Sequence, residues 1–138
     1  MRYNLQDILE SLKKESSKSG MMHKHAAACL VDNKIIIEHN KKINTNFTIH
    51  AEVGALFKCK KSLPTKLRQV DIIVIRYNHI LDKLYNSRPC NSCINTMKKS
   101  GIRKVLYINE NMELVYEYVD DMELKHISAM NRMRARMS

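Results

Sequence analysis

The side chains best suited to chemistry in this sequence form two short groups, an H-x-E triplet and a P-C-x-x-C quintet. The first contains His50 and Glu52, and the second contains Cys90 and Cys93. One imidazole and two thiolates give a zinc ion three protein ligands and leave its fourth tetrahedral position for water. Zinc lowers the pKa of such a water from about 15.7 to roughly 7, so hydroxide becomes available near neutral pH. We therefore predict a zinc site made by His50, Cys90 and Cys93.

Glu52 is the remaining side chain of this pattern, and the metal does not need it as a ligand. A carboxylate beside the activated water can carry protons from that water to a leaving group, so we predict Glu52 as the catalytic acid and base. A C-x-x-C pair alone also fits a structural zinc site or a redox disulfide. The upstream triplet and the late position of the pair in the chain favour zinc over redox use.

The spacing within each group indicates which elements hold these side chains. Cys90 and Cys93 are three residues apart, so a helix that starts there places both sulfurs on one face. Pro89 suits the start of that helix because its missing N–H is not needed there, and the positive end of the helix dipole favours thiolates. A second helix is expected from His50 to about Lys61. We expect the two helix starts to face each other across the metal.

Hydrophobic periodicity predicts the remaining elements. The expected order is helix, two strands, helix, strand, helix and two strands, and its two strand–helix–strand units imply parallel strands with right-handed crossovers. The last two strands are joined too tightly for a crossover and should be antiparallel. We predict an α/β fold of three layers, α/β/α, around a five-stranded mixed sheet with an antiparallel last strand. The expected helices run from 4 to about 16, 50–61 and 90–100, and the strands cover 26–31, 34–39, 70–75, 104–109 and 113–119, with a polar loop over 40–48 and a hairpin or helical turn within 77–88.

The composition is that of a globular domain, with 44% hydrophobic and 28% charged residues among 138. We expect a single domain over residues 1–138, with a core from about 22 to 119 and a C-terminal tail over 120–138. Because no apolar run can span a membrane and no signal peptide is evident, we expect a cytoplasmic protein with no membrane partner. Cys29, in a strand-like run, and Cys59, late in a helix, are expected to be core thiols or to have no particular role. The net charge of +10 favours phosphate-bearing partners, although solubility alone could explain it.

The two groups, in this order and with these flanking patterns, resemble the cytidine deaminase-like superfamily, in the branch that uses His-Ala-Glu and Pro-Cys-x-x-Cys. The resemblance covers about residues 32–109. It implies zinc as the cofactor, with His50, Cys90 and Cys93 as ligands and Glu52 as the proton shuttle. It also implies a homo-oligomer, because members commonly form dimers or tetramers.

Four further residues are expected to bind the substrate. The resemblance implies that Asn40, at the end of the second strand, bonds the sugar, with a turn-forming asparagine as the alternative. It also implies that the backbone of Ala51 holds the base. Arg88, just before Pro89, could meet a substrate phosphate or a local acid, and Tyr85 could stack on a base or simply pack its loop.

These features predict hydrolytic deamination of a cytosine base, in which a cytidine or deoxycytidine nucleoside or nucleotide becomes the uracil form and releases ammonia. A cytosine or adenine deaminase that edits RNA or DNA is the alternative, and a catalytically inactive zinc-bound interaction protein is a further one. The short connection between the last two strands resembles free-nucleoside deaminases, whereas the His-Ala-Glu branch commonly has a helix there. No dedicated nucleic-acid module is visible, so we favour the small-molecule substrate.

Overall fold

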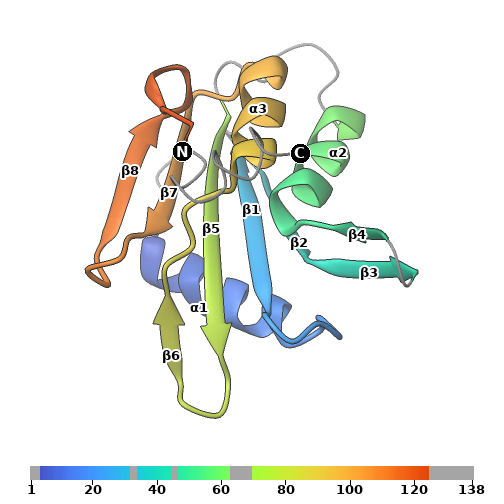
Figure 1. The fold of residues 1–138 in the computed structure, drawn as a ribbon, viewed down its shortest axis with the longest axis vertical. Coiled ribbons are helices and arrows are strands. Elements are labelled where there is room, and N and C mark those ends of the chain that lie inside the picture. Colours follow the sequence, from blue (N-terminus) through green and yellow to red (C-terminus); the bar gives the residue numbers. More distant parts are fainter. Residues whose placement is uncertain (1–3, 32–33, 45–46, 63–69, 125–138) are drawn as a thin grey trace, which may run out of the picture.

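The computed structural model describes residues 4–31, 34–44, 47–62 and 70–124 (Figure 1). Most of the expected C-terminal tail, residues 125–138, lies outside this part of the chain. The helices are α1 (Leu5–Ser16), α2 (Ala51–Ser62), α3 (Asn91–Ser100) and a short 3-10 helix, η2 (Val119–Asp121). The strands are β1 (His25–Val31), β2 (Lys34–His39), β3 (Lys41–Asn44), β4 (Phe47–Ile49), β5 (Asp71–Asn78), β6 (Lys83–Tyr85), β7 (Lys104–Ile108) and β8 (Leu114–Tyr118).

The main sheet is mixed and has the order β2-β1-β5-β7-β8, with β6 added beside β5 as a sixth strand. β5 and β7 are parallel, whereas β1 is antiparallel to both β2 and β5, and β8 is antiparallel to β7. The predicted α/β architecture with a mixed sheet and an antiparallel last pair is therefore confirmed. β2 and β5 run in the same direction, as the first strand–helix–strand unit requires, but β1 lies between them.

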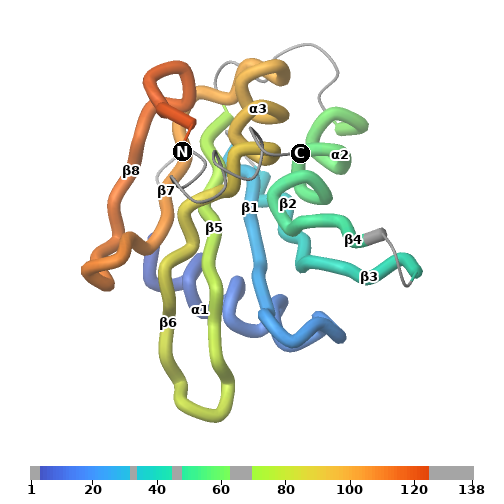
Figure 2. The backbone as a smooth tube through the Cα atoms, viewed as in Figure 1, coloured from blue at the N-terminus to red at the C-terminus, as the bar shows by residue number. Residues whose placement is uncertain are grey.

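Helices cover both faces of the sheet, which gives the predicted three layers (Figure 2). Successive side chains of β1 belong to two different cores. Ala26 and Ala28 pack with α1 on one face of the sheet, and Ala27 packs with α2 and α3 on the other. Side chains on a strand point alternately to opposite faces, so a fully apolar strand serves both layers. No helix in the described ranges is long and apolar enough to cross a membrane.

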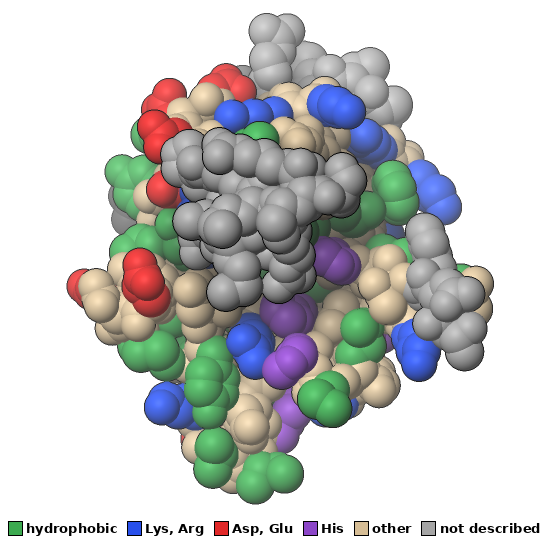
Figure 3. Space-filling view, viewed as in Figure 1, with side chains coloured by type: hydrophobic (Ala, Val, Ile, Leu, Met, Phe, Trp, Pro, Cys, Tyr) green, Lys and Arg blue, Asp and Glu red, His purple; other side chains and the backbone are tan. Residues whose placement is uncertain are grey.

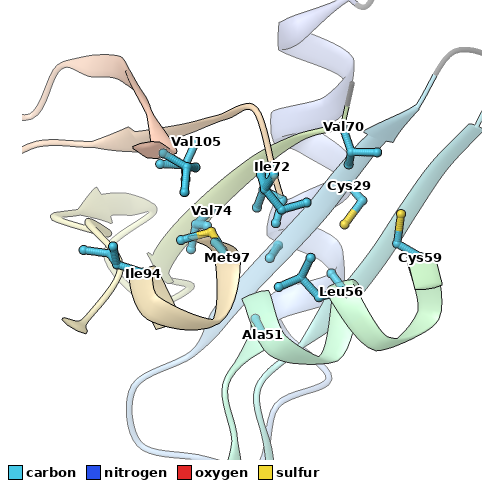
Figure 4. Close-up of a cluster of buried hydrophobic side chains, with 14 of the residues drawn as sticks. Cys29, Ala51, Leu56, Cys59, Val70, Ile72, Val74, Ile94, Met97 and Val105 are labelled. Atoms are coloured by element: carbon cyan, nitrogen blue, oxygen red, sulfur yellow. The ribbon is translucent and has the colours of Figure 1, made fainter. Parts of the chain in front are cut away.

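The larger core lies between the sheet and the two helices that carry the predicted metal ligands (Figure 4). Leu56 from α2 and Met97 from α3 are fully buried there against Ile72 of β5. Cys29 and Cys59 point into this same core, as predicted, and both are free thiols. A hydrogen bond with Cys59, together with burial, raises the pKa of the Cys29 thiol, so Cys29 stays protonated and unreactive.

The prediction of a polar loop over residues 40–48 is wrong, because β3 and β4 form a separate two-stranded hairpin there. All four residues of β3 are exposed, so the strand has no buried face and shows no apolar alternation. Within 77–88 the hairpin alternative is correct, since β6 pairs with the end of β5. The turn between them is held by Asn78, whose Oδ1 accepts hydrogen bonds from the N–H groups of Ile80 and Leu81, each over 2.9 Å.

This topology determines where the functional groups meet. β2 and β5 run in the same direction; β2 is followed by the β3–β4 hairpin and then α2, and β5 is followed by β6 and then α3. α2 and α3 therefore begin at the same edge of the sheet. In open α/β sheets ligands bind beyond the carboxyl ends of such strands.

Candidate metal centre and active site

The start of α2 positions the first group of predicted residues. His50 directly precedes the helix, and its carbonyl accepts the first helical hydrogen bond, from the N–H of Gly54 over 3.0 Å. Ala51 and Glu52 occupy the first turn and are both buried. A carboxylate there is stabilised by the positive end of the helix dipole.

The start of α3 positions the two cysteines. Cys90 is the N-cap residue, with an extended backbone (φ −70°, ψ 166°), and Cys93 lies in the first turn. The helix therefore begins one residue later than predicted, and Pro89 stands just before the cap. The helix ends as predicted at Gly101, whose φ of 77° lies in the left-handed region that glycine adopts without strain.

The geometry of these groups fits a zinc ion. The Nδ1 of His50 lies 3.1 Å from the Sγ of Cys93 and 3.7 Å from the Sγ of Cys90. Zinc–nitrogen and zinc–sulfur bonds of about 2.05 and 2.3 Å at a tetrahedral angle give a nitrogen–sulfur separation of about 3.6 Å. The potential ligand atoms of all three residues lie within 4.8 Å of one another. His50, Cys90 and Cys93 can therefore hold zinc with little movement.

The surroundings of Cys93 make a cation important for the charge balance. Burial raises the pKa of the Cys93 thiol, and the nearby charges of Glu52 and Cys90 raise it further. Without a metal this sulfur is therefore a neutral thiol at neutral pH. A bound cation favours the thiolate, so metal binding must displace a proton from Cys93.

A pocket of about 320 Å³ opens at the metal-ligand group. His50, Cys90 and Glu52 all line it, so a metal held there faces the interior of the pocket. Its volume is at the lower end of the range for small-molecule sites, about 300–1,000 Å³. The other lining residues are Met21, Met22, His23, His25, Asn40, Ala51, Asn86, Ser87 and Arg88.

Asn40 lines this pocket, but its side chain is largely committed to the chain before β1. Its Oδ1 accepts from the N–H of His25 over 2.9 Å, and its Nδ2 donates to the carbonyl of His23 over 2.7 Å. The same Nδ2 lies 3.3 Å from the Sδ of Met21. Asn40 therefore anchors residues 21–25, and what it can still offer a ligand is the second lone pair of Oδ1.

Arg88 also lines the pocket, and its guanidinium turns toward a local acid. Its Nη2 lies 3.5 Å from the Oε2 of Glu117 and donates to the carbonyl of Glu123 over 2.9 Å. Of the two partners proposed from the sequence, the structure places the acid beside it. Tyr85 does not line the zinc pocket; it lines a neighbouring hollow beside Arg76.

Two residues of the pocket carry structural roles that the sequence pattern did not indicate. Ser87 is buried, and its hydroxyl donates to the carbonyl of Val74 over 2.8 Å and accepts from the N–H of Ile108 over 2.9 Å. His25, from the start of β1, is half-buried near Glu52, and burial lowers its pKa. For His25, the only indication in the sequence is its alternation with His23 along the chain.

A second group with metal-ligating side chains, Glu15, Glu38 and His39, is an ion-pair network. The carboxylate of Glu38 lies 2.9 Å from the ammonium of Lys58 and 3.2 Å from that of Lys41. His39 Nδ1 lies 2.7 Å from the Oε2 of Glu15. Burial raises the pKa values of both carboxyls, but hydrogen bonds from their partners outweigh burial and lower them overall.

Comparison with known proteins identifies the family of this chain. A family model described as the cytidine and deoxycytidylate deaminase zinc-binding region matches residues 2–109. This chain belongs to that family. As a family member with a His–Cys–Cys group that can hold the metal, it is a zinc-dependent hydrolytic deaminase.

Solved structures show the same fold in other deaminases. A cytidine deaminase from Burkholderia pseudomallei is 19% identical, with a TM-score of 0.68 over 86% of this chain and 95% of its own. The cytidine deaminase from Bacillus anthracis is 17% identical, with a TM-score of 0.64 over 97% of each chain. A variant cytidine deaminase from Mycobacterium tuberculosis is 15% identical, with a TM-score of 0.60 over 87% of this chain and 94% of its own. No curated protein sequence matches this chain.

Proposed function

We propose that this deaminase acts on the cytosine base of a cytidine or deoxycytidine nucleoside or nucleotide, giving the uracil form and ammonia. The observation that carries the proposal is the position of Glu52. Its buried carboxylate lines the same pocket as His50 and Cys90, yet it stands outside the group that can hold the metal. A structural zinc site has no need of such a carboxylate.

In the proposed mechanism, zinc supplies Lewis-acid activation of a water molecule near neutral pH. Glu52 takes one proton from that water as the oxygen bonds to C4 of the base, and passes it to the ring nitrogen. It then transfers the second proton of the former water to the amino group, which leaves as ammonia when the bond from C4 to the amino nitrogen breaks. Its burial in the first turn of α2 fixes the carboxylate and excludes bulk water from it. General acid–base catalysis of this kind contributes about 10²–10⁴-fold to the rate.

Ala51 supports the base in this proposal through its backbone. The first N–H groups of a helix have no intrahelical acceptor, and Ala51 is the first residue of α2, in the wall of the pocket. Its N–H can therefore donate to the carbonyl oxygen or to a ring nitrogen of the base. The small side chain, which is fully buried, leaves room for the base.

A small substrate is supported by the size of the pocket and by the tight β7–β8 connection. The three similar solved structures described above are named cytidine deaminases. As part of the same proposal, the chain is one deaminase domain that works as a homo-oligomer. Free thiols at all four cysteines fit a reducing compartment, and we place the protein in the cytoplasm.

The test is ammonia release by the zinc-loaded protein from a panel of cytidine, deoxycytidine, their monophosphates, adenosine and guanine compounds, and short RNA and DNA. Glu52→Gln should lose at least about a hundredfold in rate while keeping its zinc, measured by metal analysis. Glu113→Gln, the same change at an exposed position of the β7–β8 turn, is the control and should keep full activity. Turnover of polynucleotide alone would replace the proposed substrate class. Zinc without turnover of any base would support the non-catalytic alternative.

A further inference from the structure

A second hollow lies beside the zinc pocket and shares part of its wall. Its volume is about 460 Å³, and Met22 and His23 line both spaces. The strand register also connects them: His25, which lines the zinc pocket, is the cross-strand partner of Arg76, which lines the second hollow. Directly paired residues on antiparallel strands have Cβ atoms about 4.5–5.5 Å apart. The two spaces are therefore adjacent, with Met22 and His23 in the wall between them.

The hollow is built on the β5–β6 hairpin, which projects beyond the rest of the sheet (Figure 1). β5 continues past the residues that pair with β7, and there Arg76 pairs with Tyr85 of β6. The chain before β1 forms the opposite wall, because the N–H of Tyr77 donates to the carbonyl of Lys24 over 3.1 Å. The site is therefore held by main-chain hydrogen bonds on both sides.

The charged side chains in the described lining of this hollow are cationic. Lys24 and Arg76 line it together with His23 and His79, and within the described part of the chain no Asp or Glu contributes to the lining. Figure 3 shows histidines running down the centre of this face with a basic side chain beside them, whereas the acidic side chains lie mainly along the left edge. A concave surface with this lining concentrates anions.

Arg76 differs from the other arginines of the described ranges in its partner. Arg88 and Arg103 each pair with a carboxylate. Arg76 instead places its Nη2 2.7 Å from the Nδ1 of His23. Among the residues that the structure describes, no carboxylate forms an ion pair with Arg76. Its planar fork suits two oxygens of one phosphate group.

Two tyrosines add aromatic surface to the same hollow. The ring of Tyr85 lies 5.6 Å from the guanidinium carbon of Arg76 and 5.3 Å from the Nζ of Lys83. Tyr77 forms another part of the lining. Cations beside ring faces are the combination that binds a nucleotide backbone and its neighbouring ring.

We infer that this hollow binds a phosphate group carried by the substrate, with Arg76 and Lys24 as its cationic ligands and His23 as a further donor. The inference rests on the proposed function, since the attached cytosine would occupy the zinc pocket. A terminal phosphate of a nucleotide and a phosphodiester of a short single strand present the same chemistry to these residues.

The test measures binding rather than turnover, so that chemistry does not limit it. Zinc-loaded Glu52→Gln protein is titrated by calorimetry with cytidine, cytidine monophosphate, a short single strand containing one cytosine, and inorganic phosphate, at low and high salt. The phosphate should improve binding over cytidine by about ten- to hundredfold at low salt. Salt should reduce that gain. Adding Arg76→Gln or Lys24→Gln should remove most of it, whereas Lys99→Gln, which removes one exposed charge from α3, should not.

Equal affinity for cytidine and its monophosphate and strand forms would overturn the phosphate site while leaving the proposed function intact. A gain that Arg76→Gln and Lys24→Gln leave unchanged, in variants with an unaltered melting temperature, would also overturn it. If cytidine does not bind, and cytidine monophosphate binds through Arg76 no better than inorganic phosphate, the base is not recognised: the proposed function fails and the phosphate site stands. If cytidine monophosphate binds more tightly than cytidine and the strand adds nothing further, the site takes a terminal phosphate. If only the strand binds more tightly than cytidine, the site takes a phosphodiester.

Discussion

Ser87→Ala is the substitution whose cost the structure defines most directly. The Ser87 hydroxyl bridges two strands, since it donates to the carbonyl of Val74 on β5 and accepts from the N–H of Ile108 on β7. Its own N–H donates to the carbonyl of Ile108 over 2.8 Å. Ser87 stands three residues before Cys90, so this bridge also fixes the approach of the chain to the metal-ligand group.

The expected loss of stability follows from the two groups that the substitution leaves unpaired. The hydroxyl hydrogen bonds join buried atoms, and a buried donor or acceptor without a partner costs about 1–3 kcal/mol. The Val74 carbonyl has a second lone pair and should lie at the low end, whereas the Ile108 N–H has no second option. We expect Ser87→Ala to lower the free energy of unfolding by about 2–4 kcal/mol, a large share of the total of about 5–15 kcal/mol for a domain.

Equilibrium unfolding in urea, on metal-free and zinc-loaded protein, measures this change. The control is Ser11→Ala on the exposed face of α1, which should change stability by less than about 0.5 kcal/mol. Zinc affinity should also fall in Ser87→Ala, because Cys90 is less firmly placed. If Ser87→Ala matches the control in both stability and zinc affinity, the bridge between β5 and β7 does not stabilise the site and the reasoning is refuted.

Three other perturbations test the packing, the charges and the metal. Gly54→Ala should lower the free energy of unfolding by about 1–3 kcal/mol, because the added Cβ would lie 2.8 Å from the Cγ of Glu38. The control is Gly20→Ala, whose added Cβ has no atom within 4 Å; this substitution should be neutral or slightly stabilising. Metal-free protein should lose stability in acid, because the pKa values of Glu15 and Glu38 are lowered in the folded state. The stability that the two ionised carboxylates contribute is complete above the unfolded carboxyl pKa of about 4.3 and disappears as pH falls through the folded pKa values. Chelation of zinc should lower the melting temperature, and zinc affinity should weaken as pH falls because Cys93 must release a proton.

Each of these has a contrary result. Equal melting temperatures for the two glycine variants would mean that α2 and β2 are not as closely packed as the structure shows. Acid unfolding that is unaltered in a variant with Glu15 and Glu38 both changed to glutamine would remove the network from the pH dependence. Zinc binding that releases no proton would contradict a neutral Cys93 thiol in the metal-free protein.

The sequence by itself determined the metal-ligand group and the elements that carry it. The spacing of Cys90 and Cys93 and the place of His50 before an apolar helix are local properties, and the structure brings these three side chains together. The antiparallel last pair of strands also followed locally, since its short connection permits no crossover. The strand expected over 70–75 also has a local cause, since it is a nearly continuous apolar run, and the structure buries the first five residues of β5.

The tertiary structure alone decided the surroundings of that group. The β3–β4 hairpin has no buried face, so nothing in its polar sequence distinguishes it from a loop. The roles of Ser87, Asn40 and Arg76 depend on partners 13 to 53 residues away along the chain. A periodic pattern reports which face of an element is apolar, whereas the partner of a polar side chain depends on which strands the sheet places side by side, and that order is a property of the whole chain.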